Sequence, residues 1–390
     1  MESRHLLAAR VETLRQDLVL AGSALESPSI RRDLRDSVEI LFAALIQRKT
    51  EELAAFGHTL SNGVSQDPGG LAPYWTQFEE HVEESDRLLR EYFAFIEGAL
   101  VRSAGLDNGI CDLADEYLKH LARVTAIEWQ RMTILADSEF FAPMTDIIRM
   151  RYPHFSIWNL PVLAHEFGHF VTPRLQDRLE RTDPLREFRR RIRTEARTDV
   201  PPQLADGAEE RASKHLDEFI ADAFAAYAAG PAYVCACILL RFEPAHADEE
   251  GPDHPADGRR AYLLFRLLET FSADYSKVAG TLQSMWTANL EAAGRRPMRQ
   301  PDAWLDRIAS ALAAILPALA PKARFDAAQW RNAATLSDRL LTDRRMEVAL
   351  TPNEITNGAW LCRIANDEAK APLISAKALE LFLESPRQRT

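Results

Sequence analysis

Three polar side chains within an apolar stretch, residues 158–173, have the types and spacing of a metal site. His165, Glu166 and His169 form the pattern His-Glu-x-x-His. On a helix the two histidines share one face, with Cβ atoms about 5–6 Å apart, so both imidazoles can bind one zinc ion at about 2.0–2.1 Å. Glu166 can then act as a base toward the metal-bound water. Because burying these groups among apolar residues is costly, we favour a metal site over a helix whose histidines are satisfied core or surface groups.

The residues on either side predict where this helix begins and ends. Asn159 can cap the helix, Pro161 suits its first turn, and Pro173 is expected to stop it. The remaining residues of the stretch are mostly apolar. We therefore expect a buried helix whose polar side chains face a cavity.

A second pair of acidic residues lies downstream, in a helix predicted over residues 208–227. Glu218 and Asp222 are four residues apart and share a face. Glu218 can complete a His-His-Glu zinc site that leaves the fourth position to water. Asp222 can accept the outer N–H of a ligand histidine and so fix its tautomer. His215 and Asp217 are the competing candidates for the third ligand.

The two motifs together resemble those of the gluzincin metallopeptidases, of which thermolysin is the best-known member. Residues 253–261 look like the Thr-His-Pro-x-x-x-x-Arg-Ile segment of the HtpX and CAAX prenyl endopeptidase branch, since His254 precedes a proline and Arg260 lies six residues beyond it. The resemblance covers about residues 155–270. Aspartate stands where that branch has threonine, and the membrane helices of the branch are absent. The resemblance therefore does not extend to membrane-embedded or prenylated substrates.

By this resemblance His254 would stabilise the oxyanion of a tetrahedral intermediate. The physical reason does not depend on the family, because any donor aimed at developing negative charge lowers the barrier. The alternative is a loop histidine before proline in an acidic surface turn, and the sequence leaves both interpretations open.

The charge balance of the chain bears on its partners. Among 390 residues, 47 are basic and 58 acidic, which gives a net charge of −11. We therefore expect no general affinity for nucleic acid or for an acidic membrane. An arginine-rich helix is predicted around residues 186–197. We favour a solvated face paired with local glutamates there over a patch for an acidic partner.

Three further features indicate the compartment. Residues 1–10 mix both charge signs and lack an apolar core of signal-peptide length. The weakly charged run 219–240 contains an aspartate and is broken by a Gly-Pro pair, which favours buried helices over a membrane span. Cys235-x-Cys237 lacks metal-knuckle spacing, so we expect reduced core thiols. The sequence predicts a soluble, cytoplasmic protein.

Apolar residues at three- and four-residue spacing predict helices along most of the chain. These helices are expected over residues 2–25, 29–60, 73–104, 109–137, 258–292, 299–320, 326–345 and 371–386. Residues 347–366 are expected to be irregular. Residues 144–152 can form a short strand, and zincin-type metallopeptidases use an edge strand to align an extended peptide.

The whole pattern predicts a mainly α protein. Its zincin-like metallopeptidase core would be helical with a small or minimal β-sheet, flanked by helical bundles. We expect an N-terminal helical bundle over residues 1–139, the core over 140–275 and a C-terminal helical region over 276–390.

The function that these residues predict is zinc-dependent endopeptidase activity, regulated and directed at a specific protein or peptide substrate, with a regulatory protein as a further partner. The alternative is a non-catalytic zincin-fold protein that binds a partner through its helical arms. Glu166 argues against that alternative, because a purely structural zinc usually has four protein ligands and no open position. A third interpretation, an aminopeptidase, requires a group that holds the substrate amine, and no motif clearly supplies one.

Overall fold

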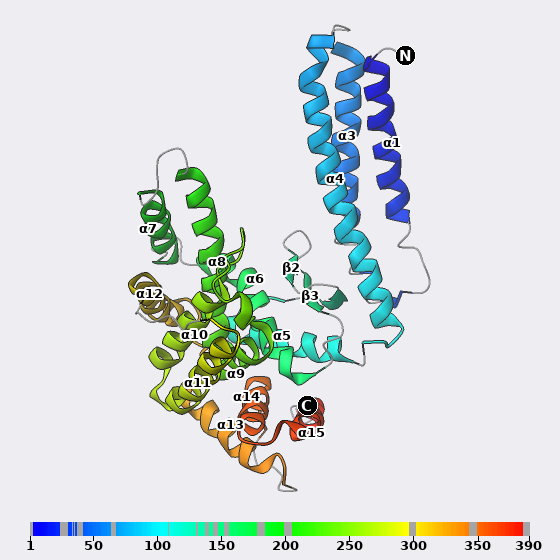
Figure 1. Cartoon of the computed structure of the whole chain (residues 1–390). Coiled ribbons are helices and arrows are strands. Elements are labelled where there is room, and N and C mark those ends of the chain that lie inside the picture. Colours follow the sequence, from blue (N-terminus) through cyan, green and yellow to red (C-terminus); the bar gives the residue numbers. More distant parts are fainter. Residues whose placement is uncertain are drawn as a thin grey trace. The chain divides into compact units, whose positions relative to one another are not determined.

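The protein is mainly helical, as predicted, with one small β-sheet (Figure 1). Within the ranges described below, no helix combines the length and apolar character that crossing a membrane requires. The computed structural model describes residues 3–23, 30–32, 34, 36, 42–63, 68–107, 109–129, 132–136, 140–142, 147–151, 156–177, 184–198, 205–295, 302–342 and 349–384.

The chain forms two compact units. The first comprises Met1–Cys111 and Arg131–Pro153, and the second comprises Asp112–Gln130 and His154–Thr390. The two histidines of the metal motif and Glu218 all belong to the second unit. The predicted division into residues 1–139, 140–275 and 276–390 stays a prediction.

Three long helices of the first unit, α1 (Ser3–Ser23), α3 (Ala44–Gly63) and α4 (Pro68–Ser103), lie side by side (Figure 1). Apolar side chains from all three form one core, as their spacing predicts. Tyr92 of α4 is buried in it and donates a hydrogen bond from its hydroxyl to the carbonyl of Ala21 at 2.9 Å. This bond satisfies a carbonyl near the end of α1.

The sheet of the first unit corrects two predictions. Its strands are β1 (Thr133–Ala136), β2 (Phe140–Ala142) and β3 (Ile147–Arg151), in the order β1-β3-β2. The helix predicted over 109–137 is therefore wrong beyond α5 (Ile110–Thr125), because residues 133–136 pair in parallel with β3. The strand predicted within 144–152 is confirmed, but it is the central strand. Since β1 and β2 occupy both of its edges, β3 cannot align a peptide by backbone pairing.

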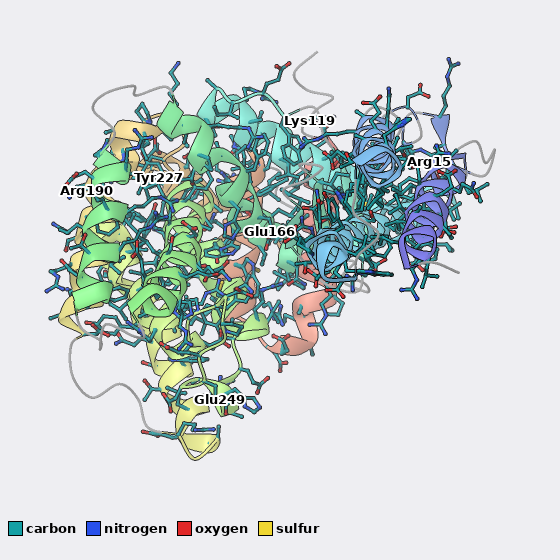
Figure 2. All side chains as sticks on the ribbon, turned by 90° about the horizontal axis from the view of Figure 1, so that it is seen from above. Arg15, Lys119, Glu166, Arg190, Tyr227 and Glu249 are labelled. Atoms are coloured by element: carbon teal, nitrogen blue, oxygen red, sulfur yellow. The ribbon has the colours of Figure 1, made fainter. Side chains whose placement is uncertain are left out.

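The second unit is built from helices packed around α8 (Ala205–Ala229) and α10 (Asp257–Phe271). Figure 2 shows Tyr227 of α8 among the helices and Arg190 at the outer edge. Tyr227 is buried and Arg190 is exposed. The other helical segments are η3 (Ile157–Val162), α6 (Leu163–Asp177), α7 (Pro184–Thr198), α9 (Pro231–Ala236), η5 (Cys237–Arg241), η6 (Pro244–His246), η7 (Ala273–Tyr275), α11 (Ser276–Ala292), α12 (Ala303–Leu319), α13 (Ala327–Arg339), α14 (Pro352–Ile364), η8 (Glu368–Lys370) and α15 (Ala371–Glu384).

Helix α14 lies where an irregular segment was predicted, and that prediction is wrong. Thr351 and Glu354 form a capping box, in which each side chain accepts from the other residue's backbone N–H. Asn357 of the same helix accepts from the backbone of Ala232 at 2.8 Å and donates to the carbonyl of Ala229 at 2.7 Å. Its amide therefore satisfies the backbone at the break between α8 and α9, which explains why a polar helix is buried there.

The arginine-rich segment forms α7, as predicted, and its ion pairs are partly local. Arg190 pairs with Glu187 at 2.6 Å and Arg191 with Glu195 at 3.8 Å. Phe188 on the same helix is buried. These contacts agree with a solvated face.

Candidate metal centre

The helix that carries the His-Glu-x-x-His motif differs in its bounds from the prediction. A 3₁₀ turn, η3, precedes α6 and contains both Asn159 and Pro161, so Asn159 does not cap the α-helix. Pro173 does not end it either, because α6 continues to Asp177. A proline removes one backbone hydrogen bond, here to the carbonyl of His169, and the buried side chains on either side keep the last turn helical.

A glycine brings the two metal-site helices together. Gly168 lies between the two motif histidines, and a Cβ placed on it would meet the Cα of Ala221 at 3.1 Å and its carbonyl oxygen at 3.3 Å. Ala221 in turn lies between Glu218 and Asp222 on α8. The absence of a side chain at Gly168 thus lets the backbones approach closely enough for the polar groups on both sides to meet.

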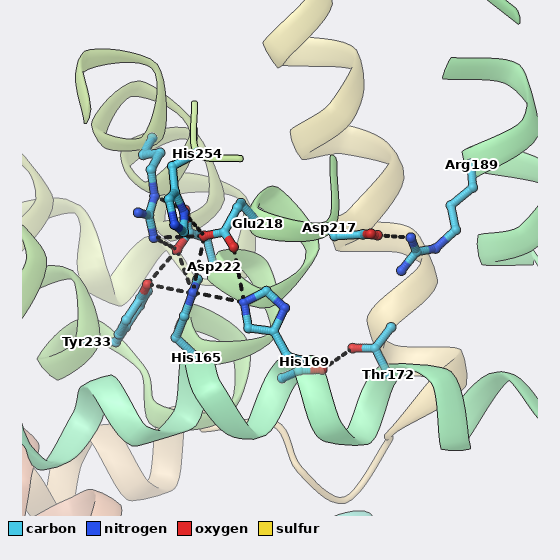
Figure 3. Close-up of polar contacts among 11 residues, drawn as sticks. His165, His169, Thr172, Arg189, Asp217, Glu218, Asp222, Tyr233 and His254 are labelled. Atoms are coloured by element: carbon cyan, nitrogen blue, oxygen red, sulfur yellow. Dashed lines mark hydrogen bonds and ion pairs between the residues drawn. The ribbon is translucent and has the colours of Figure 1, made fainter. Parts of the chain in front are cut away.

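Three side chains from these helices converge on one point (Figure 3). Nε2 of His165 lies 3.2 Å from Nε2 of His169. The carboxylate oxygens of Glu218 lie 3.4 Å from Nε2 of His165 and 3.3 Å from Nε2 of His169. His165 and Glu218 are buried, and His169 is partly exposed. The structure thus groups the three predicted ligands so that they can hold one metal ion.

The electrostatics of this cluster favour a cation between its members. Burial by itself would raise the pKa of the Glu218 carboxyl, yet its contacts with His165, His169 and His254 hold that pKa far below its usual range. Burial likewise opposes a charged His165, but the carboxylates of Asp222 and Glu218 raise its pKa to about 10. Within the described part of the chain, Oε2 of Glu218 is buried and accepts no well-aligned hydrogen bond. A buried oxygen in that condition fits a metal ligand.

Asp222 fixes the ring of His165 from behind. Its Oδ1 lies 2.9 Å from Nδ1 of His165, and the side chain has no solvent exposure. Because a carboxylate can only accept, Nδ1 carries the hydrogen and Nε2 is left to face His169 and Glu218. The guanidinium of Arg260 donates to both oxygens of Asp222, at 2.9 and 2.7 Å. Despite the desolvation that would raise it, the pKa of Asp222 is lowered, chiefly by Arg260.

Tyr233 of α9 is a member of this network that sequence reasoning missed. Its hydroxyl donates to Oδ1 of Asp222 and lies 3.2 Å from Nδ1 of His165. It follows Gly-Pro in an apolar helix, and no motif at that position points to it. Its role depends on the return of α9 past α6, which local sequence does not encode.

The structure places His254 beside the cluster. Its Nδ1 lies 3.2 Å from Oε2 of Glu218, and its side chain is 66% exposed. The carboxylate of Glu218 outweighs desolvation and raises the pKa of His254, which favours the ring as a donor. Glu166 is buried on α6 next to His165, and its carboxylate is not one of the three converging groups.

The two competing ligands have other partners. Nε2 of His215 lies 3.0 Å from the carbonyl oxygen of Gly251, and Asp217 pairs with Arg189 of α7. Neither residue belongs to the converging group, so Glu218 is the acidic residue that the structure brings to the histidines.

A second group with metal-binding residue types lies in the first unit and holds an ammonium instead. Glu52, His81 and Glu84 surround the buried side chain of Lys49. Nζ of Lys49 lies 3.2 Å from Glu52 and 3.0 Å from Nδ1 of His81, and it also pairs with Glu84. Because the lysine already supplies the positive charge, we interpret this group as a structural ion pair between α3 and α4.

Comparison of the chain with protein families, curated proteins and solved structures found no match. The interpretation of the site therefore rests on its own residues and their geometry.

Proposed function

We propose that this protein is a zinc-dependent endopeptidase of the gluzincin type with a zincin-like core. The observation that carries the proposal is the close approach of the three ligand groups. The two Nε2 atoms lie 3.2 Å apart, Oε1 of Glu218 lies 3.3 Å from Nε2 of His169, and Oε2 of Glu218 lies 3.4 Å from Nε2 of His165. Ligands bound at about 2.0–2.1 Å around a tetrahedral ion lie about 3.3–3.4 Å apart. Two imidazoles and one carboxylate are also the donor set of catalytic zinc sites that keep one position open.

The residues around the ion divide the chemistry among them. Bound zinc supplies a Lewis acid that acidifies water and polarises a peptide carbonyl. Glu166 takes a proton from the attacking water and passes it to the leaving nitrogen. His254, exposed beside Glu218, donates a hydrogen bond to the oxyanion of the tetrahedral intermediate. Asp222 holds His165 in the tautomer that binds zinc.

The partners and the compartment belong to the same proposal. The substrate is a specific protein or peptide, and a regulatory protein controls access to the site. Cys235 and Cys237 are buried thiols outside any disulfide, which fits the reducing conditions of a cytoplasm. Nucleic acid and membrane are not among the proposed partners, given the net charge of −11.

The test separates metal binding from hydrolysis with Glu166→Gln. Wild type and variant are assayed for zinc by mass spectrometry and for chelator-sensitive cleavage of casein and of a cell-extract proteome. We expect about one zinc per chain in both proteins and cleavage about 10²–10⁴-fold slower in the variant. Glu187→Gln, an exposed change on α7, is the matched control and should alter neither quantity.

Two results would count against the proposal. Loss of zinc from Glu166→Gln would contradict the role of Glu166 as a base. Zinc in the wild type without cleavage of any substrate would favour the non-catalytic partner-binding protein.

A further inference from the structure

The segment that carries His254 is exposed at residues 252–254 and becomes buried at Pro255 and Ala256. Residues 249–256 contain no helix or strand, and the side chain of His254 is 66% exposed. The backbone forms one bond within the segment, from the amide of Gly251 to the carbonyl of His254 at 2.9 Å. Buried Pro255 and Ala256 fix the chain on the C-terminal side of His254, and contacts of residues 251–253 with other elements fix it on the N-terminal side.

Two neighbouring residues of α8 make such contacts. Lys214 pairs with Asp253 at 2.8 Å, but both side chains are about half exposed, at 47% and 59%. Solvent screens a pair of this kind, and it contributes little. His215 is different, because its ring is buried and its Nε2 lies 3.0 Å from the carbonyl oxygen of Gly251. Since a carbonyl only accepts, Nε2 carries the hydrogen and donates it.

The position of His215 on α8 connects this bond to the metal site. His215 and Glu218 are three residues apart and lie on the same side of the helix. Helix α8 thus contacts the turn 251–254 at both ends. His215 contacts Gly251, and Glu218 contacts His254. Breaking the buried bond would leave the Gly251 carbonyl without its donor and free the turn from α8.

We infer that His215 is a positioning residue, which anchors the turn 251–254 to α8 and thereby sets His254 beside the metal ligand Glu218. This inference rests on the proposed function for the part that His254 plays in hydrolysis. The anchoring itself is independent of that function.

The test compares three variants in the full-length, zinc-loaded chain. His215→Phe keeps a flat ring and removes the donor, and His215→Gln keeps an N–H that can reach the carbonyl. Lys214→Met removes the exposed pairs of Lys214 with Asp253 and Glu210. Hydrogen exchange of the backbone amides in residues 249–254 should be about two- to tenfold faster in His215→Phe. It should stay near the wild-type rate in the other two. Zinc content and melting temperature show whether each variant is folded.

A double-mutant cycle with His254→Ala links the anchor to hydrolysis of a quenched fluorescent peptide library. If His215 acts through His254, kcat falls in His215→Phe and the double variant is no slower than His254→Ala alone. His215→Gln should restore most of kcat. A purely structural effect would instead multiply with that of His254→Ala and overturn the inference.

The outcomes also separate this inference from the proposed function. Unchanged exchange of residues 249–254 in His215→Phe overturns the anchor, whatever the hydrolysis shows. If the wild type binds zinc and cleaves no peptide in the library, the proposed function loses its support, while faster exchange in the variant still establishes the anchor. If His215→Phe does not fold, the comparison of His215→Gln with His215→Asn, whose shorter amide cannot reach Gly251, replaces it with the same expectations.

Discussion

Nδ1 of His165 lies 2.9 Å from Oδ1 of Asp222, and this contact is shielded from solvent. The carboxylate determines which ring nitrogen carries hydrogen and so leaves Nε2 to face His169 and Glu218. Outer contacts of this kind fix the orientation of a metal ligand and raise its basicity. The affinity for metal should therefore depend on a residue that does not touch the metal.

We predict that Asp222→Asn lowers zinc affinity about 10- to 100-fold, because the amide no longer offers a charged acceptor to Nδ1. Competition with a chromophoric chelator measures the change. Asp217→Asn on the same helix is the control, since Asp217 pairs with Arg189 outside the cluster, and its affinity should equal that of the wild type. Equal affinity in both variants would show that Asp222 does not orient the ligand.

The close approach of α6 and α8 at Gly168 gives a second prediction. Gly168→Ala places a methyl group 3.1–3.4 Å from Ala221, so the helices must separate slightly. We expect a loss of about 1–3 kcal/mol in the free energy of unfolding, together with weaker zinc binding, measured by denaturant titration and chelator competition. Gly280→Ala on α11, where the methyl group meets nothing within 4 Å, should be neutral or stabilising. A neutral Gly168→Ala would be the opposite of what this packing requires.

Arg260 compensates the buried charge of Asp222, and its removal should be costly. Arg260→Met leaves the carboxylate buried without its bidentate partner, which typically costs about 3–5 kcal/mol. Chemical unfolding of the metal-free protein measures this loss. Arg266→Met on the same helix removes a guanidinium that is 47% exposed and should cost less than about 1 kcal/mol. Similar losses in the free energy of unfolding of both variants would show that the burial of the Arg260–Asp222 pair does not increase the cost of removing the guanidinium.

The same variant should change the pH dependence of stability. In the wild type the pKa of Asp222 is held low despite its burial, so the ion pair stabilises the fold at neutral pH and is lost only in strong acid. Without Arg260, burial should raise this pKa above its value in the unfolded chain. Such a group stabilises the fold at low pH relative to neutral pH. The loss in the free energy of unfolding caused by Arg260→Met should therefore be smaller at pH 4 than at pH 7. An equal or larger loss at pH 4 would contradict the role of Arg260 as the partner of a charged Asp222.

The residues of the candidate site could be predicted in two pairs because the spacing within each pair is local. His165 and His169 are one turn apart, and so are Glu218 and Asp222, so each pair shares a helix face whatever the tertiary structure. The meeting of the two helices was inferred only from the combination of residue types. The feature that permits it, Gly168 against Ala221, has no signature in a single sequence, because a glycine in a helix is ordinarily read as a weak point.

The predictions that the structure contradicts depend on pairing between distant residues and on the effect of a proline. The spacing of apolar residues in 109–137 is typical of a helix, but residues 133–136 form a strand because they pair in parallel with β3. The order of strands in a sheet depends on pairing between distant residues, so the sequence around residues 144–152 does not show that β3 is the central strand. The rule that proline ends a helix fails at Pro173, because α6 continues beyond it to Asp177. In contrast, the capping box of Thr351 and Glu354 is a local signal, which the sequence alone could have used to predict the start of α14.

X-ray absorption at the zinc edge of the zinc-loaded wild type, compared with Glu218→Gln, tests whether His165, His169 and Glu218 bind zinc. We expect about one zinc per chain with four nitrogen or oxygen neighbours at about 2.0–2.2 Å, two of them imidazoles. We also expect weakened or lost binding in the variant. A sulfur neighbour, a third imidazole in the resting site, or a zinc environment unchanged by Glu218→Gln would contradict this expectation.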